Sequence, residues 1–188
     1  MNPVEAAATA LTLISVLLAA RLKVALYPVG IAATALFFFV FLEAKLYASA
    51  ALQVYFTAFQ IYGWWFWLRG NRGGAPAVGD WPWRTIGLLA IPAVILTIGV
   101  SLALSAWTDA AAPLGDTAML ALSVLAQFLL DRKQLKSWLV WAAANILSIG
   151  VYSASGLGMT AILYLVLLAN TVHGWLNWRA ERKREAAA

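Results

Sequence analysis

The sequence contains no cysteine, a single histidine and few charged residues. Without cysteine, disulfide bonds, thiol catalysis and cysteine-bound metals are excluded. Charged residues make up 11% of the chain and hydrophobic residues 63%, whereas a soluble domain usually carries roughly 25% charged residues. The composition therefore predicts an integral membrane protein.

Charge is missing above all from the middle of the apolar segments. Glu43, Asp109, Asp116 and Asp131 all fall at the ends of these segments or between them. Proton-coupled carriers normally expose an intramembrane carboxylate or histidine, and membrane hydrolases need a base or a metal constellation. Because neither can be assembled, we predict no enzyme activity, no catalytic residue, no metal and no cofactor, while sodium coupling stays open.

Seven apolar segments are long enough for transmembrane helices of about 20 residues, the shorter ones being near the lower limit. They cover residues 4–20, 24–42, 46–68, 85–107, 117–130, 137–154 and 158–178. With the N-terminus outside, twelve of the 13 Lys and Arg residues fall on the inner side and only Lys45 falls outside. Since cytoplasmic loops carry the excess of basic residues, the prediction is an all-α polytopic fold, N-out and C-in. The same clustering explains the net charge of +5 without nucleic-acid binding.

The chain contains an internal repeat with an offset of 111 residues. Aligning Gly63 with Gly174 brings Trp64 onto Trp175 and needs no gap over roughly 64 positions. Other matched pairs are Glu5 with Asp116, Arg21 with Arg132 and Trp67 with Trp178. Each copy holds three helices, with one helix between the copies, so both copies cross the membrane in the same direction. Transporters with such parallel repeats place the substrate site at the repeat interface.

The predicted domain organisation follows from this three-one-three plan. It comprises a first three-helix bundle at 1–68, a cytoplasmic linker at 69–84, a connecting helix at 85–107, a second three-helix bundle at 116–178 and a basic cytoplasmic tail at 179–188. The linker is rich in glycine and basic residues but lacks the Gly-Lys-Ser/Thr ending of a phosphate-binding loop. A flexible connection is therefore the favoured interpretation.

Polar and aromatic side chains form a stripe in each copy. In the first copy, three-four spacing places Gln53, Thr57, Gln60, Trp64 and Trp67 on one helix face. The second copy has Trp138, Trp141, Asn145, Ser148 and Tyr152 at similar spacing. Amides and indoles inside a membrane suit the wall of a site for a flat, polar or cationic solute. The predicted lining residues are Gln53, Gln60, Trp64, Asn145, Tyr152, Asn170 and Trp175.

Each of these features also has a purely structural interpretation. Indoles near membrane interfaces form belts, and a belt is the favoured interpretation for Trp65, Trp67, Trp81, Trp83 and Trp178. Buried amides often only bond neighbouring helices. Four of them together, Gln53, Gln60, Asn145 and Asn170, exceed what packing usually needs, which favours a binding site.

Several short motifs extend over nearly the whole chain. They are Leu46-Tyr47-Ala48-Ser49, Ile61-Tyr62-Gly63-Trp64, Asp131-Arg132-Lys133, Trp138-Leu139-Val140-Trp141 and Asn145-Ile146-Leu147-Ser148, with Gln53, Asn170 and Trp175. Together they resemble the PnuC-type vitamin transporter family. The resemblance implies a SWEET-like seven-helix fold in the bacterial inner membrane. It also implies facilitated diffusion of nicotinamide riboside, which a cytosolic kinase traps by phosphorylation. One departure is Gln60, where some close family members would be expected to carry Asn.

The substrate that the resemblance implies carries a fixed pyridinium charge. Indole and phenol faces attract such cations by roughly 0.5–2 kcal/mol each, and amides can bond the ribose hydroxyls and the carboxamide. Two alternatives stay open: a transporter of thiamine or another vitamin, and a membrane sensor that binds without transporting. The expected partners are the small cationic vitamin, the lipid bilayer and the kinase, with a homo-oligomer left open.

Overall fold

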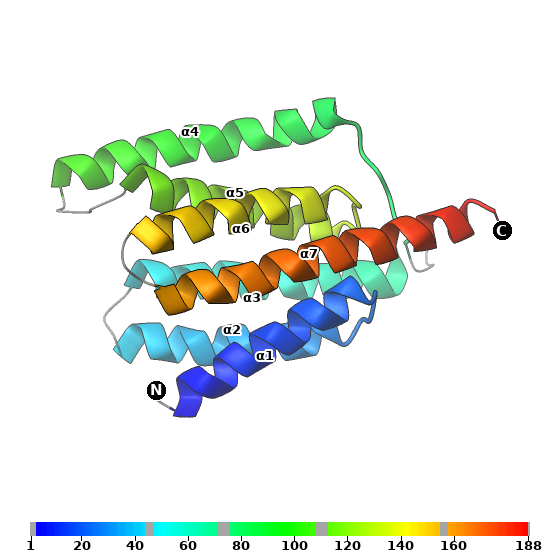
Figure 1. Ribbon diagram of the computed structural model, residues 1–188, viewed down its shortest axis with the longest axis horizontal. Coiled ribbons are helices and arrows are strands. Elements are labelled where there is room, and N and C mark those ends of the chain that lie inside the picture. Colours follow the sequence, from blue (N-terminus) through cyan, green and yellow to red (C-terminus); the bar gives the residue numbers. More distant parts are fainter. Residues whose placement is uncertain (1–2, 44–46, 71–75, 108–112, 155–157, 188) are drawn as a thin grey trace.

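The computed structural model describes residues 3–43, 47–70, 76–107, 113–154 and 158–187, which form seven α-helices (Figure 1). They are α1 (Pro3–Ala20), α2 (Leu26–Glu43), α3 (Tyr47–Arg69), α4 (Trp83–Trp107), α5 (Pro113–Asp131), α6 (Ser137–Ala154) and α7 (Gly158–Glu185). These ranges contain no strand, so the predicted all-α fold of seven helices is confirmed. Among the described residues, none of the helices combines the length and the apolar character that crossing a membrane requires.

Helix α7 is longer than the sequence predicted. It continues to Glu185, so most of the expected basic tail is helical and projects beyond the other helices at the C-terminal end (Figure 1). Arg, Lys, Glu and Ala are all good helix formers. Arg182, Lys183 and Arg184 occupy the last turn, where positive charge complements the helix dipole.

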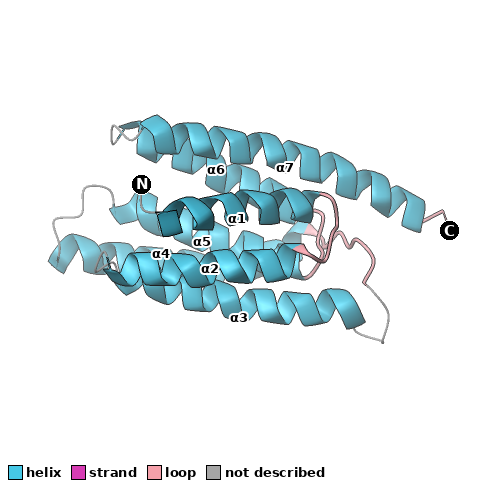
Figure 2. Ribbon diagram, turned by 90° about the horizontal axis from the view of Figure 1, so that it is seen from below, coloured by secondary structure: helices cyan, strands magenta, loops and turns pink. Residues whose placement is uncertain are grey.

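The contacts between helices follow the repeat. Helix α1 packs on α2 and α2 on α3, in the same way that α5 packs on α6 and α6 on α7. The two three-helix bundles then meet through α1 with α7 and through α3 with α5. Helix α4 packs on α5 and lies along the edge farthest from α1 and α2 in Figure 1, and Figure 2 shows all the helices running along one long axis. Each contact between repeated helices thus has a counterpart in the other copy, which supports the interpretation of a duplication.

The same turn ends the first helix of each copy. Leu22 and Lys133 occupy matched positions, and both have left-handed φ angles, 56° and 54°. The Lys23 amide donates to the Leu18 carbonyl at 3.0 Å, and the matching bond of the second copy measures 2.9 Å. A left-handed residue followed by such a six-to-one bond is a Schellman cap. The two matched turns therefore also share their backbone conformation, as the interpretation of a duplication predicts.

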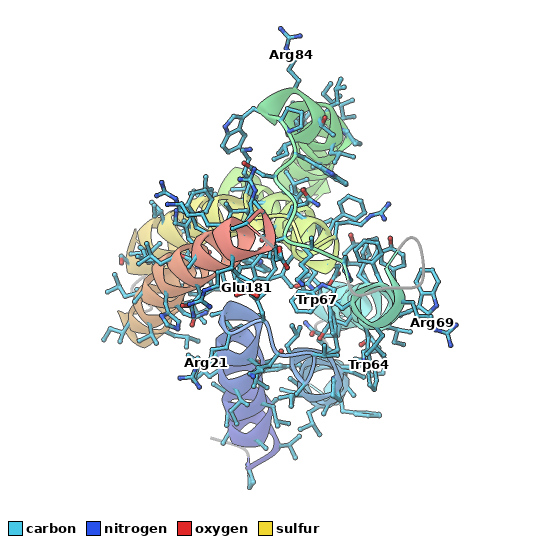
Figure 3. The ribbon with its side chains drawn as sticks, turned by 90° about the vertical axis from the view of Figure 1, so that its right-hand side faces the viewer. Arg21, Trp64, Trp67, Arg69, Arg84 and Glu181 are labelled. Atoms are coloured by element: carbon cyan, nitrogen blue, oxygen red, sulfur yellow. The ribbon has the colours of Figure 1, made fainter. Side chains whose placement is uncertain are left out.

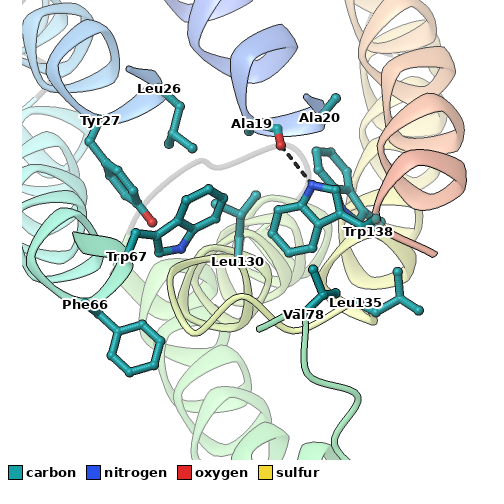
Figure 4. Close-up of a cluster of buried hydrophobic side chains, with 11 residues drawn as sticks. Ala19, Ala20, Leu26, Tyr27, Phe66, Trp67, Val78, Leu130, Leu135 and Trp138 are labelled. Carbon is teal, nitrogen blue, oxygen red and sulfur yellow. Dashed lines mark hydrogen bonds between the residues drawn. The ribbon is translucent and has the colours of Figure 1, made fainter. Parts of the chain in front are cut away.

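A group of buried aromatic and aliphatic side chains closes the bundle at the end that carries these turns (Figure 4). We call it the floor cluster. Its buried members are Ala19, Ala20, Leu26, Tyr27, Phe66, Trp67, Val78, Leu130, Leu135, Trp138 and Trp178. Tyr27 packs edge-on against Trp67 with ring centroids 5.5 Å apart, and the matched residues Trp138 and Trp178 pack edge-on at 5.4 Å.

Two indoles of the floor cluster contradict the belt interpretation. Trp67 and Trp178 are only 3% and 0% exposed, because both lie where the two bundles meet and contact each other there. The interpretation of these two side chains as belt residues is therefore wrong. Trp65 and Trp83, in contrast, are more than half exposed.

Residues 76–82 form a strap across the outer side of the floor cluster. Val78 is buried within the cluster. The Gly79 amide donates to the Lys133 carbonyl at 3.0 Å, and the Leu135 amide donates to the Gly79 carbonyl at 2.8 Å. The described part of the predicted flexible linker is thus hydrogen-bonded to the α5–α6 turn.

Charged side chains also hold the strap. Asp80 pairs with Lys136 and, at 2.7 Å, with Arg182 of the α7 extension. A carboxylate oxygen of Glu185 accepts a hydrogen bond from the Val78 amide at 2.8 Å. Burial lowers the pKa of Lys133 from its ordinary value, an effect that Glu185 opposes. The strap therefore connects the α5–α6 turn to the end of α7.

Basic side chains surround this same end of the molecule. Arg21, Arg69 and Arg84 project outward from three different elements in the view of Figure 3. They follow α1, end α3 and lie in the first turn of α4, respectively. Their common location agrees with the sequence-based prediction that they share one side.

Candidate functional site

A cavity of about 340 Å³ lies between the two three-helix bundles, next to the floor cluster. Six helices line it, and α4 contributes no described residue. The polar lining consists of Thr12, Ser15, Thr34, Gln53, Gln60, Ser123, Gln127, Asn145, Tyr164 and Thr171, and the indoles of Trp138 and Trp141 add flat aromatic surface. No acidic or basic side chain in the described part of the chain lines the cavity. Polar contacts within it must therefore come from amides, hydroxyls and indoles.

The first copy contributes an amide wall. Gln60 is 7% exposed and reaches the cavity over Gly30 of the neighbouring helix. A Cβ atom at Gly30 would collide with Gln60 Oε1 and would lie 2.8 Å from Ser15 Oγ. The Ser15 hydroxyl is fixed because it donates to the Leu26 carbonyl at 2.8 Å. Gly30 therefore creates the space that the Gln60 amide occupies.

The threonine of the first polar stripe is used for helix packing. Thr57 and Thr34 share a hydrogen bond of 2.8 Å between their hydroxyls, which connects α3 to α2. Thr34 lines the cavity, whereas Thr57 lies behind it. Only part of the predicted stripe thus faces the cavity.

The second copy contributes an aromatic wall. Trp138, Trp141 and Asn145 line the cavity at the three-four spacing of one α6 face, and Asn145 is 3% exposed. Ser148, the next residue of the predicted stripe, donates to the Ala144 carbonyl of its own helix at 2.8 Å. The lining face of α6 therefore runs from Trp138 to Asn145 in the described part of the stripe.

The repeat makes the two walls comparable position by position. Gly30 in the first copy corresponds to Trp141 in the second, and Gln60 corresponds to Thr171. The first copy thus combines an absent side chain with a long amide, while the second combines a large indole with a short hydroxyl. All four residues line the cavity. A flat ring can lie on the indole side while polar substituents reach the amide side.

The floor cluster closes one end of the cavity. Leu26, Leu130 and Trp138 belong both to the cluster and to the cavity lining. The Trp178 indole N–H donates to the Ala19 carbonyl at 2.9 Å, shown as a dashed line in Figure 4. Because these side chains come from both bundles, a path through this end requires the bundles to separate.

The structure brings three of the predicted lining residues together on the cavity: Gln53, Gln60 and Asn145. Trp64 is 36% exposed on the outside of α3 and does not line the cavity. Trp175 also lies off the cavity and packs against the floor cluster.

The other two predicted lining residues are Asn170 and Tyr152. Asn170 is buried and donates to the Val16 carbonyl of α1 at 3.2 Å, which is the packing role that the alternative interpretation foresaw. It does not line the cavity. Tyr152 belongs to α6, but its side chain lies outside the described residues.

One buried pair was missed by the sequence analysis. Asp131, which was assigned to the end of an apolar segment, is 0% exposed, and one of its oxygens accepts a hydrogen bond from Gln127 at 3.0 Å. Gln127 lines the cavity. The available signal was the spacing of four residues between an amide and a carboxylate on one helix. In the described residues, no three His, Asp or Glu side chains gather as a metal site.

Comparison with known proteins assigns the chain to a family of transporters. Residues 2–180 match the family model described as Nicotinamide mononucleotide transporter. The Nicotinamide riboside transporter PnuC of Escherichia coli (strain K12) is 27% identical over 212 residues, covering 97% of this chain and 89% of the relative. The Riboflavin/roseoflavin transporter RibM of Streptomyces davaonensis is 23% identical over 142 residues, covering 73% of this chain and 67% of the relative.

A solved structure has the same fold. The crystal structure of the Vitamin B3 transporter PnuC superposes with a TM-score of 0.75 at 22% identity, covering 97% of this chain and 84% of that one. Together the comparisons confirm the predicted resemblance, and with it the prediction of a membrane transporter that is not an enzyme.

Proposed function

The chain belongs to the nicotinamide mononucleotide transporter family, and we propose that it carries nicotinamide riboside across the bacterial inner membrane by facilitated diffusion. One observation carries the proposal: amides of one bundle and indoles of the other converge on a single cavity at the bundle interface. Its volume of about 340 Å³ falls in the range of sites for small organic ligands.

The chemistry of the two walls fits the two ends of this substrate. The pyridinium ring carries a fixed positive charge, and the indole face of Trp141 attracts a cation by roughly 0.5–2 kcal/mol. Gln53, Gln60 and Asn145 supply donors and acceptors for the ribose hydroxyls and the carboxamide. The solute thus exchanges its hydration for contacts with amides and aromatic rings.

A passive mechanism fits the uncharged lining of the cavity. Proton-coupled carriers normally expose a carboxylate or histidine on the pathway of the substrate. The lining in the described residues offers no acidic, basic or histidine side chain for this role. Net uptake then follows the concentration gradient of the riboside, and a cytosolic kinase that phosphorylates it would keep that gradient inward.

The exposed surface fits a lipid environment. Leu88, Ile95 and Leu102 on α4 are 68%, 65% and 66% exposed, and lipid is the solvent in which such an apolar helix face is stable. Arg21, Arg69 and Arg84 all lie at the end closed by the floor cluster. By the positive-inside rule, that end faces the cytoplasm and the N-terminus faces outward.

Uptake into proteoliposomes tests the proposal. Purified protein in lipid vesicles should equilibrate labelled nicotinamide riboside without a proton or sodium gradient, and enclosing a riboside kinase with ATP should raise the retained label. Protein-free vesicles serve as the control. Absence of uptake would refute the transport function, and accumulation above the external concentration without the kinase would refute the passive mechanism.

A different flat vitamin is the second candidate. It is favoured by the relative named as a riboflavin/roseoflavin transporter, since that protein shows another vitamin carried on a related chain. Thiamine is a further candidate because it is also a cationic heteroaromatic. Quenching of tryptophan fluorescence by each vitamin separates them, because Trp138 and Trp141 line the cavity. Quenching without any flux in vesicles would instead identify a binding or sensor protein.

A further inference from the structure

Gln127 meets a buried carboxylate on the side facing away from the cavity. The Nε2 group of Gln127 donates to Oδ1 of Asp131, one turn further along α5, at 3.0 Å. Gln127 lines the cavity, whereas Asp131 does not and is 0% exposed. The carboxylate therefore contacts the cavity wall from behind and does not touch a bound solute.

The surroundings of Asp131 are built to hold this carboxylate. Gly63 of α3 faces it so closely that a Cβ atom there would lie 2.7 Å from Asp131 Cγ and 2.7 Å from a ring carbon of Tyr27. Three helices thus converge on Asp131, and the absent side chain at Gly63 makes the space. Asp131 Oδ2 and the Tyr27 hydroxyl, which interact with each other electrostatically, are both buried and form no hydrogen bond of standard geometry in the described residues.

The neighbouring basic residues engage other groups. The guanidinium of Arg132 lies 5.2 Å from the centre of the Phe66 ring, and the ammonium of Lys133 lies 5.4 Å from that of Trp67. In the described part of the chain, neither forms an ion pair with Asp131. Gln127 is therefore the side chain whose hydrogen bond to Asp131 the structure defines.

This contact determines which end of the Gln127 amide faces the cavity. An ionised carboxylate only accepts hydrogen bonds, whereas an amide has a donating nitrogen and an accepting oxygen. With the nitrogen turned to Asp131, the oxygen remains for the cavity. We infer that Asp131 is a positioning residue that presents Gln127 Oε1 as an acceptor for a donor group on the substrate, such as the carboxamide N–H or a ribose hydroxyl.

The inference predicts which ligands the site prefers and rests on the proposed riboside transport. A substrate that donates a hydrogen bond at this point should bind better than one that places a carboxylate there, because two acceptors facing each other are left unpaired. The carboxylate analogue of nicotinamide riboside, with a carboxylate in place of the carboxamide, and the deoxyribosides remove candidate donors one at a time. Their affinities for the wild-type protein identify which group Gln127 meets.

A double-mutant cycle tests the role of Asp131. We expect Gln127→Leu to weaken riboside binding about 3- to 10-fold, as the loss of one hydrogen bond does. Asp131→Asn should cause a similar loss and narrow the preference for the amide over the carboxylate, because Asn can donate to Gln127 and allow its amide to turn over. In the Gln127→Leu background, Asp131→Asn should change affinity no further. Glu181→Gln, on the exposed part of α7, is the control and should leave binding unchanged.

The possible outcomes distinguish a failure of the proposed function from a failure of the positioning role of Asp131. If the wild-type protein binds no riboside, the proposed function fails. If it binds but Asp131→Asn leaves the amide preference unchanged, or weakens binding equally in both backgrounds, the positioning role is overturned. If Asp131→Asn does not fold, the affinities of the same ligand series are measured for the wild-type protein and for Gln127→Leu. If removing a donor group from the ligand changes the affinities of these two proteins equally, the inference is also overturned.

Discussion

Trp67 and Trp178 lie at matched positions of the two copies, and their rings contact each other with centroids 5.6 Å apart. Each also packs edge-on against an aromatic residue in the first turn of the middle helix of its own copy, Tyr27 or Trp138. The floor cluster thus contains a chain of four rings, and the central contact of this chain joins the two bundles. Separation of the bundles at this end must break that central contact.

The two central indoles differ in their hydrogen bonds, which leads to a first prediction. The Trp178 N–H donates to the Ala19 carbonyl at 2.9 Å, whereas the Trp67 N–H is buried without a partner in the described residues. Trp178→Phe should therefore destabilise the protein by about 1 kcal/mol more than Trp67→Phe, the typical contribution of one hydrogen bond. Thermal unfolding in detergent, followed by circular dichroism, measures the difference. Equal effects would show that the Trp178 hydrogen bond contributes nothing to stability.

The two repeat-defining glycines give a second prediction. A Cβ atom at Gly63 would lie 2.7 Å from Tyr27, and one at Gly174 would lie 2.6 Å from the Trp138 ring. Overpacking of this kind usually costs about 1–3 kcal/mol, so we expect Gly63→Ala and Gly174→Ala to lower the unfolding temperature and the yield of folded protein.

Gly150 provides a matched control for these substitutions. It also lies within a helix, but a Cβ atom there would meet nothing within 4 Å. Gly150→Ala should be neutral or stabilise by up to about 1 kcal/mol through helix propensity. If all three alanine variants behaved alike, close packing would not be the reason for Gly63 and Gly174.

The sequence predicts the helices and the duplication, because apolar length and a constant offset are both local or pairwise signals. It predicts less well which residues of the polar stripe face the cavity. Consecutive residues of an α-helix are about 100° apart, so once Gly63 faces Asp131, Trp64 must point to the outside. The face of α3 lines the cavity as far as Gln60, and from Gly63 onward it packs against the other bundle. The three-four spacing alone does not show where this change occurs.

The buried carboxylate could not be predicted for a related reason. Asp131 ends α5, a position that is normally exposed at a helix end, and an isolated sequence gives no measure of its burial. It is buried because α3 of the other copy and the Tyr27 ring pack over it. Contacts between elements this distant in sequence depend on the packing of whole bundles, which helix periodicity does not specify.

Gly30 gives a third prediction, which concerns binding more than stability. A Cβ atom at this position would collide with the Gln60 oxygen, the end of a flexible side chain. Gly30→Ala should therefore displace the Gln60 amide and weaken riboside binding about tenfold, the effect of about 1.4 kcal/mol, while the protein stays folded. Fluorescence titration measures the affinity. Gly87→Ala, where a Cβ atom would meet nothing within 4 Å, is the control, and equal affinities for the two variants would contradict a binding role for Gln60.

The strap gives the last prediction. Asp80 joins Lys136 of the α5–α6 turn to Arg182 of α7. The apolar contacts of the strap come from Val78 and Trp81, which lie on either side of Gly79 and Asp80. Asp80→Ala should lower the free energy of local opening by about 1 kcal/mol, since partly exposed ion pairs contribute at most that much. Amide hydrogen exchange at Gly79 and Leu135 should then accelerate about fivefold, and high salt should reproduce part of this effect in the wild-type protein.

Glu181→Ala is the control for this prediction. It removes an exposed ion pair within α7 alone and should leave the exchange rates of both amides unchanged. If Glu181→Ala accelerated exchange to the same extent, general loosening of α7, and not the Asp80 bridge, would control the strap.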